Sequence, residues 1–188
     1  MAWALWITGL PGSGKSTIAA QLIKLLYNAG VVADFLRLDE IRKEFVKDPK
    51  YTEEERDLVY SKMIESAQAL VNSGRNVIID ATAHRKRYRD QGRASLPKYL
   101  EVYVKCDLNI CIDRETKRGS GLVTAEMYRK GIERRRTGKE FKDLGEVIGV
   151  DVPFEEGGED LVISSDKMSA EVAAKKIFGT LKKRGFVK

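Results

Sequence analysis

Short apolar runs alternate with amphipathic segments along most of the chain. The apolar runs predict buried strands at residues 2–8, 31–38, 76–80, 100–105 and 161–164. Apolar residues at helical spacing predict helices at residues 16–28, 39–46, 52–72, 108–116 and from 169 onward. Strands that alternate with helices pair in parallel, and right-handed crossovers place the helices on both faces. The pattern predicts an α/β fold of three layers, α/β/α, with a five-stranded parallel sheet.

One segment does not fit this alternation. Residues 117–139 are rich in Lys and Arg and are interrupted by glycines. We expect this segment to belong to a basic lid at approximately residues 114–140. The lid is inserted in a single domain that spans residues 1–188.

Composition narrows the class of protein. The 34 Lys and Arg exceed the 28 Asp and Glu by 34 − 28 = 6 charges, a basic excess that suits an anionic ligand. Cys106, Cys111 and the single His84 are too few for a disulfide framework or a zinc site. No apolar run reaches the roughly 20 residues that span a bilayer. The first apolar run lacks the basic start of a signal peptide, so we expect a cytoplasmic protein without a membrane partner.

The strongest motif is the sequence of residues 9–16, which fits the phosphate-loop pattern G-x-x-x-x-G-K-[ST]. It follows a predicted strand and opens a predicted helix, as the pattern requires. Glycines let backbone N–H groups approach phosphate oxygens, and the helix start adds unpaired donors. We expect Lys15 to reach the β- and γ-phosphates of ATP and Ser16 to bind Mg²⁺. The residues predicted to bind nucleotide are Gly9, Leu10, Pro11, Gly12, Ser13, Gly14, Lys15 and Ser16.

A phosphate loop alone does not fix the reaction. A GTPase requires an N/T-K-x-D guanine reader, and the nearest match, residues 104–107, begins with Val104, which cannot hydrogen-bond. No D-x-x-G switch follows the third strand, where Asp80 precedes Ala81. A motor ATPase normally belongs to a larger assembly. These observations favour a kinase that acts on a small molecule.

Two aspartates follow predicted strands at the sheet edge where ligands gather. Asp39 is predicted to orient the attacking hydroxyl and to accept its proton, and Asp80 to hold a water on Mg²⁺. The alternative is that each only caps the segment that it begins. Arg42 lies on the same helical face as Asp39 and could clamp an anionic acceptor, unless it is a solvated surface residue.

The basic segment offers candidates for charge stabilisation. A lid over the triphosphate would exclude water, and Arg114, Arg118, Arg129 and Lys130 are its candidate cations. A solvated charged helix is the alternative, and Glu133 among three arginines supports it locally. The same segment could follow a nucleic-acid backbone, but it has no series of aromatic residues on which bases would stack.

Taken together, these motifs resemble the adenylylsulfate kinase family of small P-loop kinases. Residues 9–17 match the family's phosphate loop, and residues 38–42 resemble its D-x-x-R element. Residues 52–56 resemble the short acidic segment that leads into its next helix and ends in an arginine, here Arg56. Residues 99–104 resemble its fourth strand. Residues 128–130 resemble its basic lid, and residues 149–155 a signature ahead of its last strand.

The resemblance implies a P-loop kinase that transfers the γ-phosphoryl group of ATP to the 3′-hydroxyl of adenylylsulfate, often as a homodimer. It also implies that Thr17 contacts the nucleotide. The residues that the resemblance places at the acceptor are Asp39, Arg42, Arg56, Arg85 and Lys130.

The chain departs from the family pattern on the acceptor side. After Arg56 the family usually has an Asn and an Arg that hold adenylylsulfate, where this chain has residues 58–60, Leu-Val-Tyr. After the third strand the family reads Ser-Phe-x-Ser-Pro, where this chain has Asp-Ala-Thr at residues 80–82. This ending also resembles polynucleotide 5′-kinases and seryl-tRNA kinases. We therefore predict an adenylylsulfate kinase. The first alternative is a polynucleotide 5′-kinase or a seryl-tRNA kinase, and the second is a nucleotide-dependent switch or binding protein.

Overall fold

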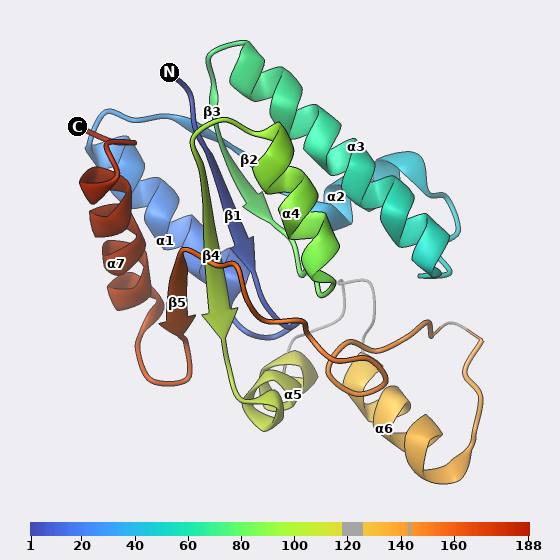
Figure 1. Cartoon of the computed structure of the whole chain (residues 1–188). Coiled ribbons are helices and arrows are strands. Elements are labelled where there is room, and N and C mark those ends of the chain that lie inside the picture. The colour runs from blue at the N-terminus through green and yellow to red at the C-terminus, as the bar shows by residue number, and fades with distance from the viewer. Residues whose placement is uncertain (118–125, 143) are drawn as a thin grey trace.

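The computed structural model describes residues 1–117, 126–142 and 144–188. Within them one five-stranded parallel sheet has the order β2-β3-β1-β4-β5, with helices on both faces (Figure 1). This confirms the predicted α/β/α architecture. The strands are β1 (Ala4–Thr8), β2 (Ala33–Arg37), β3 (Asn76–Asp80), β4 (Tyr99–Lys105) and β5 (Leu161–Ser164). The helices are α1 (Lys15–Asn28), α2 (Leu38–Phe45), α3 (Glu53–Asn72), α4 (Lys86–Ser95), α5 (Leu108–Thr116), α6 (Met127–Thr137) and α7 (Ala170–Lys183).

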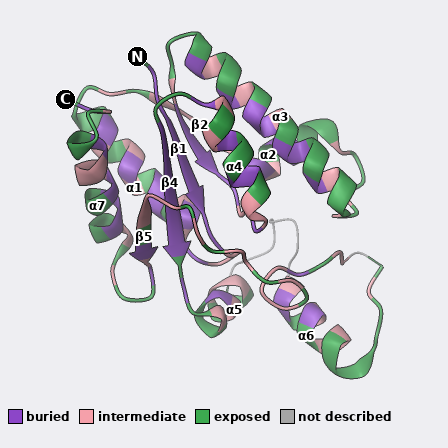
Figure 2. Ribbon diagram, viewed as in Figure 1, coloured by how far each residue is buried: buried purple, intermediate pink, exposed green. Residues whose placement is uncertain are grey.

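Side chains that alternate along β1 fill two separate cores. Trp6 faces the core that α2, α3 and α4 cover, where Met63 and Tyr88 are also buried. Leu5 and Ile7 face the core that α1 and α7 cover. The three central strands, β1, β3 and β4, are accordingly buried on both faces almost throughout (Figure 2), which explains their continuous hydrophobicity, whereas the edge strands β2 and β5 are only partly buried.

Thr52 caps α3 as the sequence predicts. Its hydroxyl accepts a hydrogen bond from the backbone N–H of Glu55, at 3.3 Å. Ser169 likewise caps α7, where its hydroxyl accepts from the N–H of Val172. These caps fix the boundaries of two predicted helices to within a residue.

The sequence pattern did not predict α4. Its buried residues are Tyr88, Arg89 and Gly92, so it lacks an apolar stripe. A Cβ at Gly92 would lie 2.7 Å from the ring of Trp6, so this glycine lets α4 pack directly on the sheet. Arg89 is buried because its Nε donates to Glu101 at 2.7 Å, and both side chains are almost fully buried. The helix is buried through an ion pair and a glycine, which hydrophobic periodicity does not detect.

A smaller core joins the carboxyl end of the sheet to α5 and α6. It contains Cys106, Cys111, Tyr128 and Val147. In this small core the described part of the lid packs against the segment around residue 147. Of the helices in the described part of the chain, none is both long and apolar enough to span a membrane.

Candidate active site

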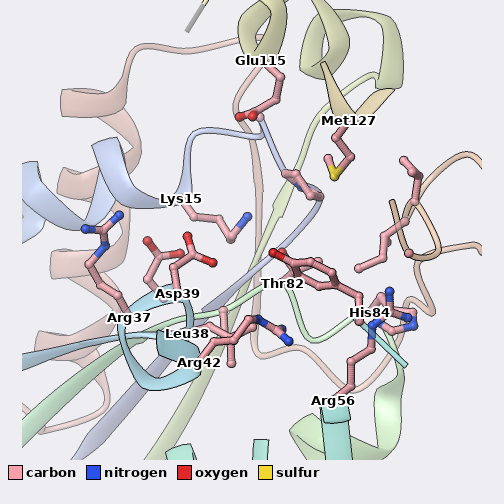
Figure 3. Close-up of a pocket in the computed structure, with 18 of the residues that line it drawn as sticks. Lys15, Arg37, Leu38, Asp39, Arg42, Arg56, Thr82, His84, Glu115 and Met127 are labelled. Carbon is pink, nitrogen blue, oxygen red and sulfur yellow. The ribbon is translucent and has the colours of Figure 1, made fainter. Parts of the chain in front are cut away.

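A cavity of about 170 Å³ lies at the carboxyl edge of the sheet, beside the phosphate loop. Four other segments line it: residues 37–42 at the start of α2, 51–60 at the start of α3, 80–84 after β3, and 144–148. Glu115 and Met127 contribute from α5 and α6. Figure 3 shows the side chains of Lys15, Asp39 and Arg42 around this space. Because all the strands are parallel, loops far apart in sequence meet at this one edge.

The phosphate loop takes a conformation that its glycines permit. Gly12 has φ +80°, and a Cβ on it would lie 2.4 Å from the carbonyl oxygen of Cys111. Gly14 has φ +95° and precedes the first residue of α1, and no side chain of the described residues caps this helix start. The first N–H groups of α1 are therefore left to bind an anion.

Lys15 is buried within this loop. Its Nζ donates to the carbonyls of Gly9 and Leu10, at 2.9 Å each. Burial lowers the pKa of Lys15, and the negative charges of Asp80 and Asp39 oppose this shift. A phosphate group would supply the charge partner that the two neutral carbonyls do not.

Ser16 and Asp80 are brought together from α1 and the end of β3. The Ser16 hydroxyl donates to Asp80 Oδ2 at 2.5 Å. The pair consists of oxygen ligands of the kind that Mg²⁺ prefers, and a triphosphate and waters would complete its coordination. Among the described residues no group of three or more His, Cys, Asp or Glu could hold a metal alone.

Asp39 and Arg42 enter the cavity from the first turns of α2. Arg42 is buried, and its Nη1 donates to Glu55 Oε1 at 2.5 Å. Its guanidinium also lies over the ring of Tyr51, 4.7 Å from the centroid. Glu55 Oε2 accepts from the backbone N–H groups of Lys50 and Tyr51, at 2.6 and 2.9 Å. One carboxylate thus fixes both the arginine and the loop that carries the tyrosine.

Arg56 lines the cavity from the first turn of α3. Its Nη1 donates to Glu146 Oε2 and its Nη2 to the carbonyl of the same residue, at 2.9 Å each. Residues 56 and 146 lie 90 positions apart, so this contact ties α3 to the segment that follows α6.

The loop after β3 is fixed by buried contacts. The Tyr60 hydroxyl accepts from the N–H of Ala83 at 2.7 Å, and Arg89 donates to the carbonyl of Ala83 at 2.6 Å. His84 lines the cavity with 1% exposure. Burial, assisted by the charges of Arg56 and Arg85, lowers the pKa of His84 to about 4, so its ring is neutral at physiological pH.

Helix α6 contacts both sides of the cavity. The Tyr128 hydroxyl donates to the carbonyl of Pro11 in the phosphate loop, at 2.9 Å. Gly131 lies against Val147, where a Cβ would be 2.9 Å from a methyl carbon. The helix therefore packs closely against the segment that carries Glu146.

The structure brings together most of the residues that the sequence singles out. Those that line the cavity are Pro11, Gly12, Gly14, Lys15, Ser16, Asp39, Arg42, Arg56 and Asp80. Gly9, Leu10, Ser13 and Thr17 belong to the same loop and the helix that follows it.

Other predicted residues of the described part of the chain are not among those that line the cavity. Arg114 lies behind the loop and donates to the carbonyl of Ser165 at 3.0 Å. Arg85 pairs with Glu155 at 3.1 Å. Lys130 lies over the ring of Phe141, 5.9 Å from its centroid. Arg118 lies outside the described residues, and the roles predicted for these four cations stay predictions.

Sequence reasoning missed several residues of the cavity wall. Tyr51, Glu146 and Val147 line it, but no motif marked them. The only signal for Tyr51 was its place directly before the helix cap Thr52. Val59 and Tyr60, which stand where the family has acceptor contacts, are buried in the core, although Tyr60 also reaches the cavity wall.

Comparisons with known proteins agree on a family. The model of the adenylylsulphate kinase family matches residues 1–156. A probable adenylyl-sulfate kinase of Bacillus subtilis is 31% identical over 186 residues, which cover 97% of this chain and 85% of that protein. An adenylyl-sulfate kinase of Clostridium kluyveri is 32% identical over 179 residues, which cover 94% and 82%.

A solved structure shares the fold. The Mycobacterium tuberculosis APS kinase in complex with AMPPNP and APS superposes with a TM-score of 0.77 at 22% identity, over 96% of this chain and 98% of that one. The fold, the phosphate loop and the sequence matches lead to one assignment: the chain belongs to the adenylylsulfate kinase family of ATP-dependent kinases.

Proposed function

We propose that this protein transfers the γ-phosphoryl group of ATP to the 3′-hydroxyl of adenylylsulfate. The observation that carries the proposal is the extent of the family match. It spans residues 1–156, and every residue that lines the cavity falls within that span. The match therefore includes the acceptor side as well as the phosphate loop.

The phosphate loop supplies the donor side of this reaction. The N–H groups at the start of α1 would bind phosphate oxygens, and Lys15 would exchange its two carbonyl partners for the triphosphate. Burial makes this charge pairing strong because little water competes for it. Ser16 would bind Mg²⁺ and Asp80 would hold a water on it, and the ion neutralises charge on the phosphates when it is bound.

The acceptor side would position the hydroxyl. Asp39 lies at the start of α2 beside Lys15, where it would orient the hydroxyl and accept its proton. Arg42 and Arg56 would bind the anionic groups of the acceptor. The lid at residues 114–140 would exclude water, and a homodimer in the cytoplasm is the expected form of the enzyme.

The proposal is tested by supplying γ-labelled ATP with a panel of acceptors. The panel contains adenylylsulfate, adenosine 5′-monophosphate, gluconate, RNA and DNA 5′-ends, and seryl-tRNA. We expect label in 3′-phosphoadenylylsulfate and none in the nucleic acids. Label in a nucleic-acid end or in seryl-tRNA would replace the proposal by the alternative that residues 80–82 suggested. Hydrolysis that no acceptor diverts would indicate a nucleotide-dependent switch.

A further inference from the structure

Two arginines of the cavity are each paired with a carboxylate, and the two carboxylates are held very differently. Glu55, the partner of Arg42, is 11% exposed and also accepts from two backbone N–H groups. It cannot leave Arg42 without freeing the loop at residues 50–51. Glu55 therefore holds Arg42 in place at the cavity wall.

Glu146, the partner of Arg56, makes fewer contacts than Glu55 does. Its side chain is 53% exposed, whereas that of Arg56 is 5% exposed. Among the described residues, Arg56 alone donates to the Glu146 carboxylate. The Glu146 carboxylate faces water and is readily hydrated when it leaves, whereas buried Arg56 requires a charge partner, so the carboxylate leaves when another anion takes its place.

Arg56 stays oriented when the carboxylate leaves. Its Nη2 donates to the backbone carbonyl of Glu146 at 2.9 Å, a contact that does not depend on the side chain. Departure of the carboxylate therefore leaves Nη1 as a fixed and buried donor on the cavity wall. Such a donor forms a strong, charge-assisted hydrogen bond with an incoming anion.

We propose that Glu146 is a specificity-determining residue whose carboxylate occupies the anion-binding position at Arg56 until the acceptor displaces it. The phosphate or sulfate ester of an acceptor replaces the carboxylate and accepts the hydrogen bond that Arg56 Nη1 had donated to Glu146. A neutral acceptor leaves the pair intact and gains nothing from Arg56. The inference rests on the proposed function, because it assigns this side of the cavity to the acceptor.

The test replaces the carboxylate by its neutral amide, Glu146→Gln. We expect the KM for adenylylsulfate to fall about three- to tenfold, since the competing charge is gone. The kcat and the KM for ATP should change less than about twofold, and the gain should shrink at high ionic strength. Glu146→Asp retains the charge and should stay close to the wild-type enzyme.

Glu65→Gln is the matched control, because it removes the same charge from an exposed pair with Lys62 on α3. It should leave both KM values unchanged. A KM for adenylylsulfate that is unchanged in Glu146→Gln would overturn the inference, because nothing would then compete at Arg56. A raised KM would also overturn it and would identify Glu146 as a contact that helps to bind the acceptor.

A binding experiment separates this inference from the proposed function. With Mg²⁺ and a non-hydrolysable ATP analogue bound, adenosine 5′-monophosphate is titrated calorimetrically into wild-type and Glu146→Gln enzyme. Tighter binding to the variant supports exchange at Arg56 even if adenylylsulfate receives no label. Equal or weaker binding counts against the exchange even if the kinase reaction is confirmed.

Discussion

Apart from Asp80, the donor side of the cavity is one continuous segment, whereas the acceptor side is assembled from separate ones. Gly9 to Thr17 present backbone N–H groups and one lysine, and their conformation follows from glycines within the segment. The acceptor side combines α2, α3, the loop after β3 and residues 144–148. The arginines of the acceptor side are oriented by carboxylates that lie elsewhere in the sequence: Glu55 pairs with Arg42, and Glu146 pairs with Arg56.

Because of this difference, the two sides tolerate amino-acid substitutions to different extents. The donor loop would bind a triphosphate in a backbone conformation that requires glycine at positions 12 and 14, so few substitutions at these positions are compatible with it. The acceptor side binds through side chains, so a change at one distant residue can alter which acceptor fits. Substrate choice is therefore expected to depend on the segments around the loop.

The largest expected effect is on the donor side. Lys15→Ala removes the charge that neutralises the transferring phosphoryl group, so kcat/KM should fall roughly 10³- to 10⁴-fold, or about 4–5.5 kcal/mol. Turnover is measured with labelled ATP. Lys24→Ala, on the exposed face of α1, is the control and should be neutral. Activity of Lys15→Ala within tenfold of wild type would contradict the role of Lys15 in this comparison.

The next effect separates the two sides. Asp39→Asn keeps the shape of the side chain but removes the proton acceptor, so kcat should fall roughly 10²- to 10³-fold while ATP affinity stays near wild type. Glu44→Gln, an exposed change on the same helix, is the control. Equal losses in turnover and ATP affinity would show that Asp39 supports the structure of the site and does not act on the hydroxyl.

A smaller effect is expected when the carboxylate that orients Arg42 on the acceptor side is changed. Glu55→Gln weakens the bond to Arg42 and the bonds to the loop at residues 50–51. We expect the KM for the acceptor to rise about tenfold and the free energy of unfolding to fall by roughly 1–3 kcal/mol. ATP affinity should not change. Urea unfolding and initial rates measure both, with the exposed Glu54→Gln as control. A loss of ATP affinity as large as the loss of acceptor affinity would remove the distinction between the sides.

The last effect, on stability rather than on turnover, is a pH dependence from the acceptor side. His84 has a pKa of about 4 in the folded protein against 6.5 for the free side chain. Between these values the unfolded chain binds a proton that the folded chain does not. This group's contribution is therefore full above pH 6.5 and is lost as the pH falls toward 4, by up to about 1.4 kcal/mol per pH unit.

The charged groups around His84 affect its protonation, and a substitution of His84 tests its contribution to the pH dependence of stability. Arg56, Arg85 and Arg87 oppose its protonation, and Glu155 favours it. His84→Asn should flatten the slope of unfolding free energy between pH 6.5 and 5, where most carboxylates stay ionised. Parallel slopes in urea titrations of the two proteins would show that His84 titrates normally.

The sequence predicts the donor side well because its information is local. Residues 9–16 form the loop by themselves, and the predicted strand and helix on either side confirm the context. Asp39, Arg42 and Asp80 could also be placed, since each lies at the end of a parallel strand or in the helix turn that follows.

The remaining features depend on contacts that no local pattern encodes. Glu146 meets Arg56 across 90 positions, and only the folded chain brings them together. Helix α4 was missed because an ion pair buries Arg89, whereas periodicity recognises only apolar burial. Arg114 donates to the loop carbonyls of Gly12 and Ser13 and to the carbonyl of Ser165, and these contacts span 51 to 102 positions of the chain.

The position of α6 has a consequence for how the two substrates influence each other. The helix touches the phosphate loop through Tyr128 and has no room for even a methyl group between Gly131 and Val147. Because α6 contacts both walls closely, we expect a shift of one wall to reach the other. Thermodynamic linkage then requires reciprocity: whatever factor the nucleotide applies to acceptor affinity, the acceptor applies to the affinity for the nucleotide.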